Sequence, residues 1–300
     1  MNNRNNPYHV VDLSAERRGM AAYQDFKSGK HCMYALLEVD VTFAMKFIED
    51  YEAKTSEKLS FTGYLISCLA RAVDEDKAVQ AYRKGGKQMI LFDDVDVGFM
   101  IELKKGEKRL LTGHVIRAAN GKTFREIHQE IRSVQSSQVT SDAERASWFR
   151  SAMLLPWPLS SWFKALFRMI LSRNPTIATS MAGTVGISSV GMFGKGHSGW
   201  GIANGSHVLD LVVGGTARKL AEVDGRIEPR QMLSLTIIFD HDMIDGAPAA
   251  RFTRRLVELI ESGYGLDENE TISANNSEPA AVRTEQVLAE RGTANESYHP

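Results

Sequence analysis

The polar turn around His241 is the part of the sequence best suited to acid–base chemistry. It follows an apolar, β-branched run over residues 234–239, which predicts a buried strand, and it precedes a helical pattern that begins near Pro248. A histidine at a strand end is held by rigid backbone and changes its charge near neutral pH, so His241 is a candidate general base. The alternative is a capped strand end that carries a surface histidine.

Composition narrows the class of protein. The 300 residues are 43% hydrophobic, which is enough for a sizeable core, and the net charge of -1 argues against a nucleic-acid-binding surface. Cys32 and Cys68 form neither a disulfide framework nor a CxxC metal site, so we expect reduced thiols in a cytoplasmic protein. We expect no metal site, because the spacing of these histidines does not suit one: His9, His31, His114, His128, His197 and His207.

Hydrophobic periodicity predicts the helices and strands that must hold the turn around His241. Helices are expected over residues 14–28, 42–54 with Thr42 as cap, 60–73, 123–136 and 248–262. Strands are expected over residues 34–41, 87–92, 95–103, 110–116, 183–189, 208–215 and 232–239. A hairpin turn is expected at Asp224-Gly225, and a glycine-rich loop at residues 190–196. No stretch resembles a signal peptide or a spanning helix.

One further segment, residues 148–174, is unusually apolar. Ser160 can cap a helix whose apolar stripe includes Trp162 and Leu166, with Lys164 and Arg168 one turn apart on another side. Tryptophans and cations in this arrangement suit a membrane surface or a hydrophobic partner. The alternative is a helix packed on its own core or on a neighbouring subunit.

The motif His241-x-x-x-Asp245-Gly246, between a strand and a helix, resembles the active-site motif of the chloramphenicol acetyltransferase-like fold. It is most similar to the catalytic domain of the dihydrolipoamide acyltransferase component of 2-oxoacid dehydrogenase complexes. Further resemblances occur in the family's order along the chain: Arg18 and Ser28 ahead of Asp40, then residues 95–100, 115–127 and 183–194. Together they cover residues 14–262.

The resemblance implies an α/β (α+β) two-layer sandwich with a mixed sheet flanked by helices. The catalytic domain would span residues 14–265, between an N-terminal arm at 1–13 and a polar, disordered tail at 266–300. The implied activity is CoA-dependent acyl transfer, with His241 as general base and Ser188 stabilising the oxyanion. Ser189 is the nearest competitor for that role. Asp245 would fix the turn through an ion pair to Arg18. Alternatively, Asp245 and Gly246 would simply be residues that favour a turn.

The resemblance also implies a homotrimer with active sites between subunits and CoA in a tunnel along each interface. A charged loop could meet the CoA phosphates, or could merely be solvated: Lys104, Lys105, Lys108 and Arg109. We expect no covalently bound lipoyl group and no metal, and a lipoyl domain in trans is a candidate acceptor. The competing hypotheses are a non-catalytic scaffold with this fold, and an acyltransferase for a hydrophobic or membrane-associated acceptor.

Overall fold

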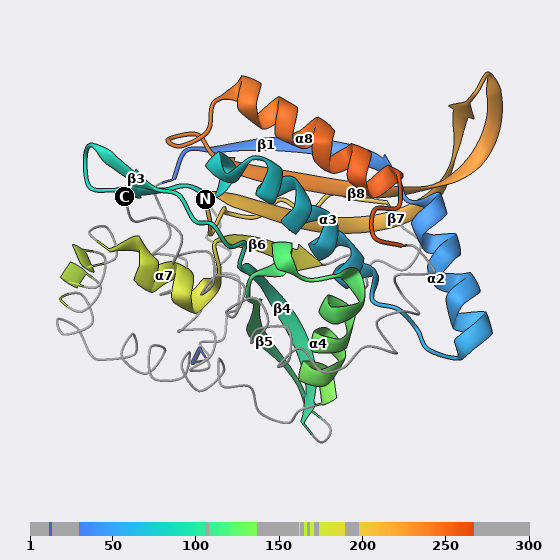
Figure 1. Cartoon of the computed structure of the whole chain (residues 1–300), viewed down its shortest axis with the longest axis horizontal. Helices are drawn as coiled ribbons and strands as arrows, with labels where there is room; N and C mark the ends of the chain where they lie inside the picture. The colour runs from blue at the N-terminus through green and yellow to red at the C-terminus, as the bar shows by residue number, and fades with distance from the viewer. Residues whose placement is uncertain are drawn as a thin grey trace, which may run out of the picture.

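The computed structural model describes residues 12–13, 30–105, 108–136, 162, 165–166, 169–170, 174–189 and 198–266. They form two layers, a mixed sheet and a group of helices on one of its faces (Figure 1). The sheet has the order β1-β8-β7-β6-β4-β5. Only the β4–β6 and β6–β7 pairs within it are parallel. The predicted fold class is therefore confirmed.

The strands of the large sheet are β1 (Cys32–Asp40), β4 (Val97–Lys105), β5 (Lys108–Ile116), β6 (Val185–Ser189), β7 (Leu209–Val223) and β8 (Arg226–Asp240). A separate hairpin consists of β2 (Tyr82–Lys84) and β3 (Gln88–Ile90). The helices are α2 (Thr42–Thr55), α3 (Phe61–Glu75), α4 (Phe124–Ser136), α7 (Pro175–Ala182) and α8 (Gly246–Glu261), with 3₁₀ turns at Lys77–Gln80 and Ala119–Gly121.

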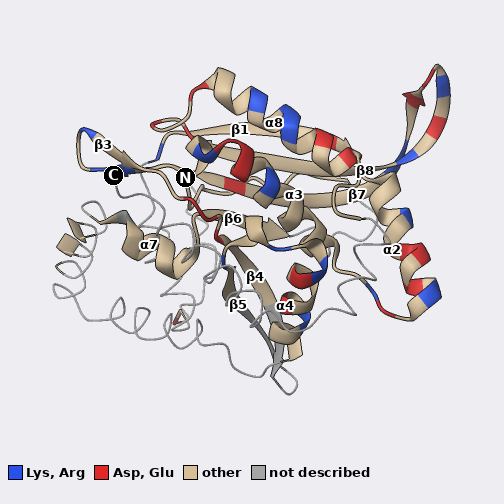
Figure 2. Ribbon diagram, viewed as in Figure 1, with Lys and Arg blue, Asp and Glu red and all other residues tan. Residues whose placement is uncertain are grey.

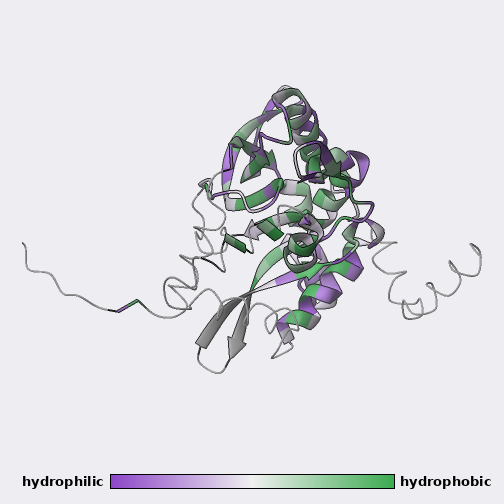
Figure 3. Cartoon of the chain, turned by 90° about the vertical axis from the view of Figure 1, so that its left-hand side faces the viewer, coloured by the Kyte–Doolittle hydropathy of each residue, from purple (hydrophilic) through white to green (hydrophobic). Residues whose placement is uncertain are grey.

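Helix α3 lies at the centre of the helical layer. It begins at Ser60, whose hydroxyl accepts a hydrogen bond from the Gly63 N–H at 3.1 Å and caps the helix. Tyr64 is fully buried, and its hydroxyl donates to the Ile260 carbonyl of α8 at 2.5 Å. The helices turn apolar sides to the core and polar sides outward, as the hydropathy colouring shows (Figure 3). Charged residues accordingly lie along the outer sides of α2 and α8 (Figure 2).

The two faces of the sheet differ because successive residues of a strand point to opposite sides. One face packs under the helices and belongs to the core, with Leu211 of β7 and Ile237 of β8 among its residues. The other face carries polar side chains, including Asp210 and Thr236. Residues 198–207 cross this second face, where the Gly199 N–H donates to the Ser234 hydroxyl at 3.2 Å. We call this second side the loop face.

Several predicted boundaries need correction. Thr42 is the first residue of α2 rather than its cap, because its hydroxyl bonds to the Asp40 carboxylate instead of to the helix. Helix α8 begins two residues before Pro248. Strands β7 and β8 continue to the predicted turn, where Asp224 and Gly225 have φ of 50° and 78°.

The predicted helix at 14–28 and the tail at 266–300 lie outside the described residues, apart from Leu266. Most of the apolar segment at 148–174 also lies outside them. Among the helices that the structure describes, none combines the length and apolar character that crossing a bilayer requires.

Candidate active site

His241 begins the turn between β8 and α8. Its backbone N–H donates to the carbonyl of His31, just before β1, at 2.7 Å. The next two bonds of the turn run from the N–H groups of Met243 and Ile244 to the Asp240 carbonyl, both at 3.0 Å. The imidazole itself is exposed. The backbone of the candidate base is therefore fixed, while its side chain remains open to a substrate or to another subunit.

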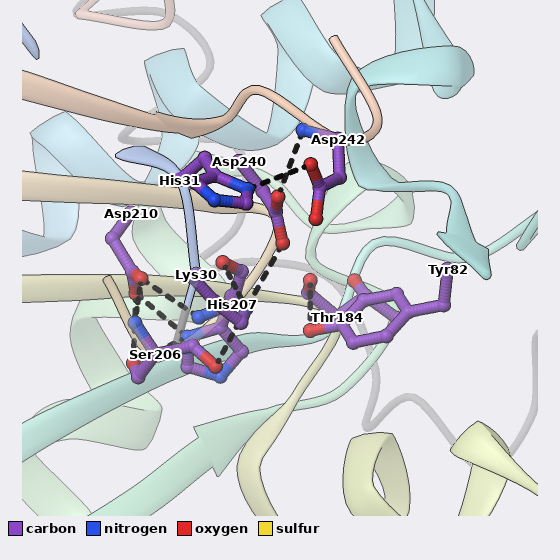
Figure 4. Close-up of polar contacts among 9 residues, drawn as sticks. All are labelled: Lys30, His31, Tyr82, Thr184, Ser206, His207, Asp210, Asp240 and Asp242. Carbon is purple, nitrogen blue, oxygen red and sulfur yellow. Dashed lines mark hydrogen bonds and ion pairs between the residues drawn. The ribbon is translucent and has the colours of Figure 1, made fainter. Parts of the chain in front are cut away.

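Asp240 joins this turn to two other segments. It is 8% exposed, and one carboxylate oxygen accepts the Asp242 N–H at 3.1 Å. The other oxygen lies 3.5 Å from the ammonium nitrogen of Lys30. Lys30 also donates to the carbonyl of His207 at 2.8 Å (Figure 4). One lysine therefore connects the end of β8 with the start of β7.

A second pair lies on the exposed side of the turn. His31 Nδ1 is 3.0 Å from a carboxylate oxygen of Asp242, and both side chains are exposed (Figure 4). The segment formed by Lys30 and His31 thus contacts the residues on both sides of His241.

Asp245 and Gly246 occupy the start of α8. Asp245 is the N-cap residue, but its exposed carboxylate makes no capping hydrogen bond. A Cβ added to Gly246 would meet no atom within 4 Å, so the described residues do not require a glycine there. Arg18 lies outside the described residues, and its ion pair with Asp245 stays a prediction.

The two candidate serines lie at the end of β6 and point to different faces. Ser188 is half-buried and shares the loop face with Gly186, whereas Ser189 follows the alternation of the core residues Val185 and Ile187. The glycine-rich continuation at 190–197 lies outside the described residues.

Ser188 and His241 do not meet within one chain. Ser188 is in register with Val212 of β7, which is in register with Thr236 of β8. Asp240 lies four residues further along β8, roughly 13 Å, and β6 and β8 are two strand spacings, about 10 Å, apart. The backbones at Ser188 and Asp240 are thus separated by about 16 Å, so the Ser188 and His241 side chains do not contact each other within one chain.

A buried ionisable cluster, Ser206, His207 and Asp210, lies on the loop face. His207 Nδ1 is 2.6 Å from one oxygen of Asp210, and the other oxygen accepts the Ser206 and His207 N–H groups at 2.5 and 2.7 Å. His207 Nε2 lies 3.0 Å from the Ala182 carbonyl. Burial would raise the pKa of Asp210, but the imidazole and the two N–H groups outweigh it and hold that pKa well below its usual range.

This cluster is not a nucleophilic triad. A triad requires the serine and the carboxylate on different nitrogens of the ring, yet the Ser206 hydroxyl lies 2.8 Å from Nδ1, the same nitrogen that Asp210 contacts. Its bonds instead fasten residues 206–207 to β7 and, through Ala182, to the end of α7.

Sequence reasoning missed Lys30, Asp210 and the contacts of Asp240. Asp210 gave a local signal, because a carboxylate interrupts the apolar run Val208 to Val213. Lys30 gave none, because its partners are far along the chain. In the charged loop, the backbone of Lys104 is in register with that of Arg109, and the backbone of Lys105 with that of Lys108. Across the described ranges, no three His, Cys, Asp or Glu residues are grouped to hold a metal ion.

The mixed sheet layered with helices, and the His-x-x-x-Asp-Gly turn between β8 and α8, are typical of the catalytic domains of one class of acyltransferases. The chain belongs to the family described as 2-oxoacid dehydrogenases acyltransferase (catalytic domain), whose model matches residues 6–145 and 159–266.

Two similar proteins have names that are consistent with this family. Over 228 residues the chain is 25% identical to the mitochondrial dihydrolipoyllysine-residue succinyltransferase component of the 2-oxoglutarate dehydrogenase complex of Saccharomyces cerevisiae, covering 75% of this chain and 41% of that protein. It is 23% identical over 248 residues to the lipoamide acyltransferase component of the branched-chain alpha-keto acid dehydrogenase complex of Bacillus subtilis, covering 80% and 48%. The chain therefore spans less than half the length of these two relatives.

A solved structure supports the fold. The dihydrolipoamide acetyltransferase of Azotobacter vinelandii superposes with a TM-score of 0.62 at 24% identity, covering 88% of this chain and 96% of that one.

Proposed function

We propose that the protein is a CoA-dependent acyltransferase that moves an acyl group between CoA and a thiol or hydroxyl acceptor. The observation that carries the proposal is His241, exposed on a rigid turn at the end of β8 within the family's motif. The Azotobacter vinelandii enzyme was investigated for the catalytic roles of a serine, a histidine and an asparagine. Its histidine and asparagine are four positions apart, the spacing of His241 and Asp245.

In the proposed reaction, His241 takes the proton of the acceptor thiol or hydroxyl as that group attacks the thioester carbonyl. Ser188 donates a hydrogen bond to the oxyanion that forms. When the carbon–sulfur bond breaks, the imidazolium returns the proton to the CoA thiolate. Ser188 suits this role better than Ser189, because it points away from the core residues under the helices.

We further propose a homotrimer in which His241 of one subunit faces Ser188 of the next. The separation of about 16 Å between these two parts of one chain supports this arrangement, since the two side chains do not contact each other within one chain. CoA would bind along the interface, and a lipoyl group carried by another chain is the proposed physiological acceptor.

The direct test is CoA release from a panel of acyl-CoAs with dihydrolipoamide and with other thiols and alcohols. His241→Ala should lower the rate by roughly two to four orders of magnitude, because a general base contributes about that much. The matched control is His114→Gln on β5, at the opposite edge of the sheet from β1. Equal rates in wild type and His241→Ala would overturn the role of His241. A chain that neither transfers acyl groups nor binds CoA would instead be a scaffold with this fold.

A second candidate is an acyltransferase whose acceptor is hydrophobic or membrane-associated. Trp162 and Leu166, four positions apart in helical backbone, are 77% and 53% exposed. Co-sedimentation with anionic liposomes should weaken in Trp162→Ala and remain in Leu220→Ala, which removes an equally exposed apolar side chain on β7. Co-sedimentation that is unchanged by Trp162→Ala would argue against this candidate.

A further inference from the structure

Lys30 and His31 form a short segment immediately before β1 that contacts three successive residues, Asp240, His241 and Asp242. Of these five residues, only His241 is a defined position of the His-x-x-x-Asp-Gly motif. We propose that Lys30 and His31 are positioning residues for His241, holding its turn from both sides during acyl transfer. This inference rests on the proposed function of His241.

The contact between the Lys30 ammonium group and Asp240 is stronger than the contact between the His31 imidazole and Asp242. Its side chain is 28% exposed and that of Asp240 is 10% exposed, so the ion pair is partly shielded from water. The same ammonium donates to the His207 carbonyl at 2.8 Å, a bond that fixes its position independently of Asp240. Loss of Lys30 would leave the buried carboxylate of Asp240 without its cation, and such a loss is costly.

Asp240 transmits this contact to the turn. Its carboxylate accepts the Asp242 N–H and its carbonyl accepts two further N–H groups, those of Met243 and Ile244. A rotation of Asp240 therefore moves the backbone on which the imidazole is mounted. Figure 4 shows Lys30 between Asp240 and the 206–210 segment, with His31 beside Asp242.

His31 acts mainly through its backbone. Its carbonyl accepts the His241 N–H at 2.7 Å, whereas its imidazole pairs with Asp242 where both side chains are largely in water. Exposed pairs contribute little, so a change of the His31 side chain should matter less than a change of Lys30. The proposal therefore predicts a smaller effect for a His31 side-chain variant than for a Lys30 variant.

Hydrogen–deuterium exchange tests the contact without any activity assay. Four consecutive amides, from His241 to Ile244, are hydrogen-bonded in this turn. Peptides covering them should exchange several-fold faster in Lys30→Ala and should regain protection in Lys30→Arg, which restores the cation. Peptides from α3 report whether the variant is folded. The matched control is Lys219→Ala, which removes an ion pair to Glu38 on β1.

Kinetics with acetyl-CoA and dihydrolipoamide then test the catalytic consequence. We expect Lys30→Ala to lower kcat by about 10- to 100-fold with little change in KM, because a small misplacement of a base costs about this much. In a His241→Ala background the same change should have almost no further effect, because Lys30 acts through His241.

Two results would overturn the proposal. One is turn exchange in Lys30→Ala that matches wild type or Lys219→Ala. The other is a Lys30→Ala rate loss of the same size with and without His241. If wild type transfers no acyl group with any donor and acceptor of the panel, the proposed function fails, and the exchange experiment alone decides whether Lys30 holds the turn.

Discussion

His128 is a buried histidine whose two ring nitrogens have different roles. Nδ1 accepts the Ser60 N–H at 3.0 Å, and Nε2 lies 3.0 Å from a carboxylate oxygen of Glu57. This arrangement requires the neutral ring, because a protonated Nδ1 could not accept. Burial accordingly lowers the pKa of His128, and the neighbouring Glu57 only partly opposes this effect.

The sign of the resulting pH dependence follows from this lowered pKa. As the pH falls below about 6.5, the unfolded chain binds a proton at His128 before the folded chain does, so the free energy of unfolding decreases. Urea unfolding at pH 8 and pH 5.5 should show this loss in wild type and a smaller loss in His128→Gln. His31→Gln, at an exposed position, is the control. An equal loss in wild type and His128→Gln would contradict the assignment.

Gly186 is the position on β6 where the Ser206–His207–Asp210 cluster allows no side chain. A Cβ there would lie 2.1 Å from an oxygen of Asp210 and 2.5 Å from Nδ1 of His207. We expect Gly186→Ala to lower the free energy of unfolding by about 1–3 kcal/mol, the usual cost of overpacking. Gly86→Ala, where a Cβ would meet nothing within 4 Å, is the comparison for thermal unfolding. Equal melting temperatures for the two variants would refute this packing argument.

The residues of the candidate site could be predicted only where their spacing along the chain is local. His241 and Asp245 are four positions apart and share one turn, so the motif shows them together. Lys30 reaches partners 177 and 210 positions away, His207 and Asp240. No periodicity along the chain can indicate such a contact, because it depends on β1 lying beside β8.

At the scale of elements, the β7–β8 hairpin shows what local patterns can and cannot predict. The Asp224-Gly225 turn was predictable, because both positions adopt φ > 0 and this residue pair favours it. The strand lengths were not. The apolar run ends where the hairpin leaves the helical layer, yet its backbone pairing continues from Thr216 to Val223 on β7. There β7 alternates between half-buried and exposed residues, from Ala217 to Val223.

The same hairpin provides a test of backbone strain. Gly225 has φ of 78°, a conformation that side chains disfavour. Gly225→Ala should therefore lower the free energy of unfolding by about 1 kcal/mol. Gly121→Ala has similarly open surroundings without a positive φ, and its effect should be smaller in the same thermal unfolding measurement. A Gly225→Ala protein that is as stable as wild type would show that the turn relaxes without cost.

For the molecule as a whole, the mixed sheet and its helical layer were predictable, and the structure agrees with the prediction. That prediction came from the resemblance to the acyltransferase family, because the order of the strands along the chain does not by itself give the sheet order β1-β8-β7-β6-β4-β5. Local patterns along the chain likewise could not indicate the relation between Ser188 and His241. It depends on the register of β6, β7 and β8, which separates the two residues within one chain.

That separation makes the proposed trimer testable by subunit mixing. Ser188→Ala chains retain His241, and His241→Ala chains retain Ser188, so each homotrimer should be nearly inactive. In trimers refolded from an equal mixture, about a quarter of the interfaces would pair an intact His241 with an intact Ser188 of the neighbour. We therefore expect the mixture to recover up to about a quarter of wild-type acyl transfer. If both residues acted within one chain, every site in the mixture would lack one of them, and mixing would restore nothing.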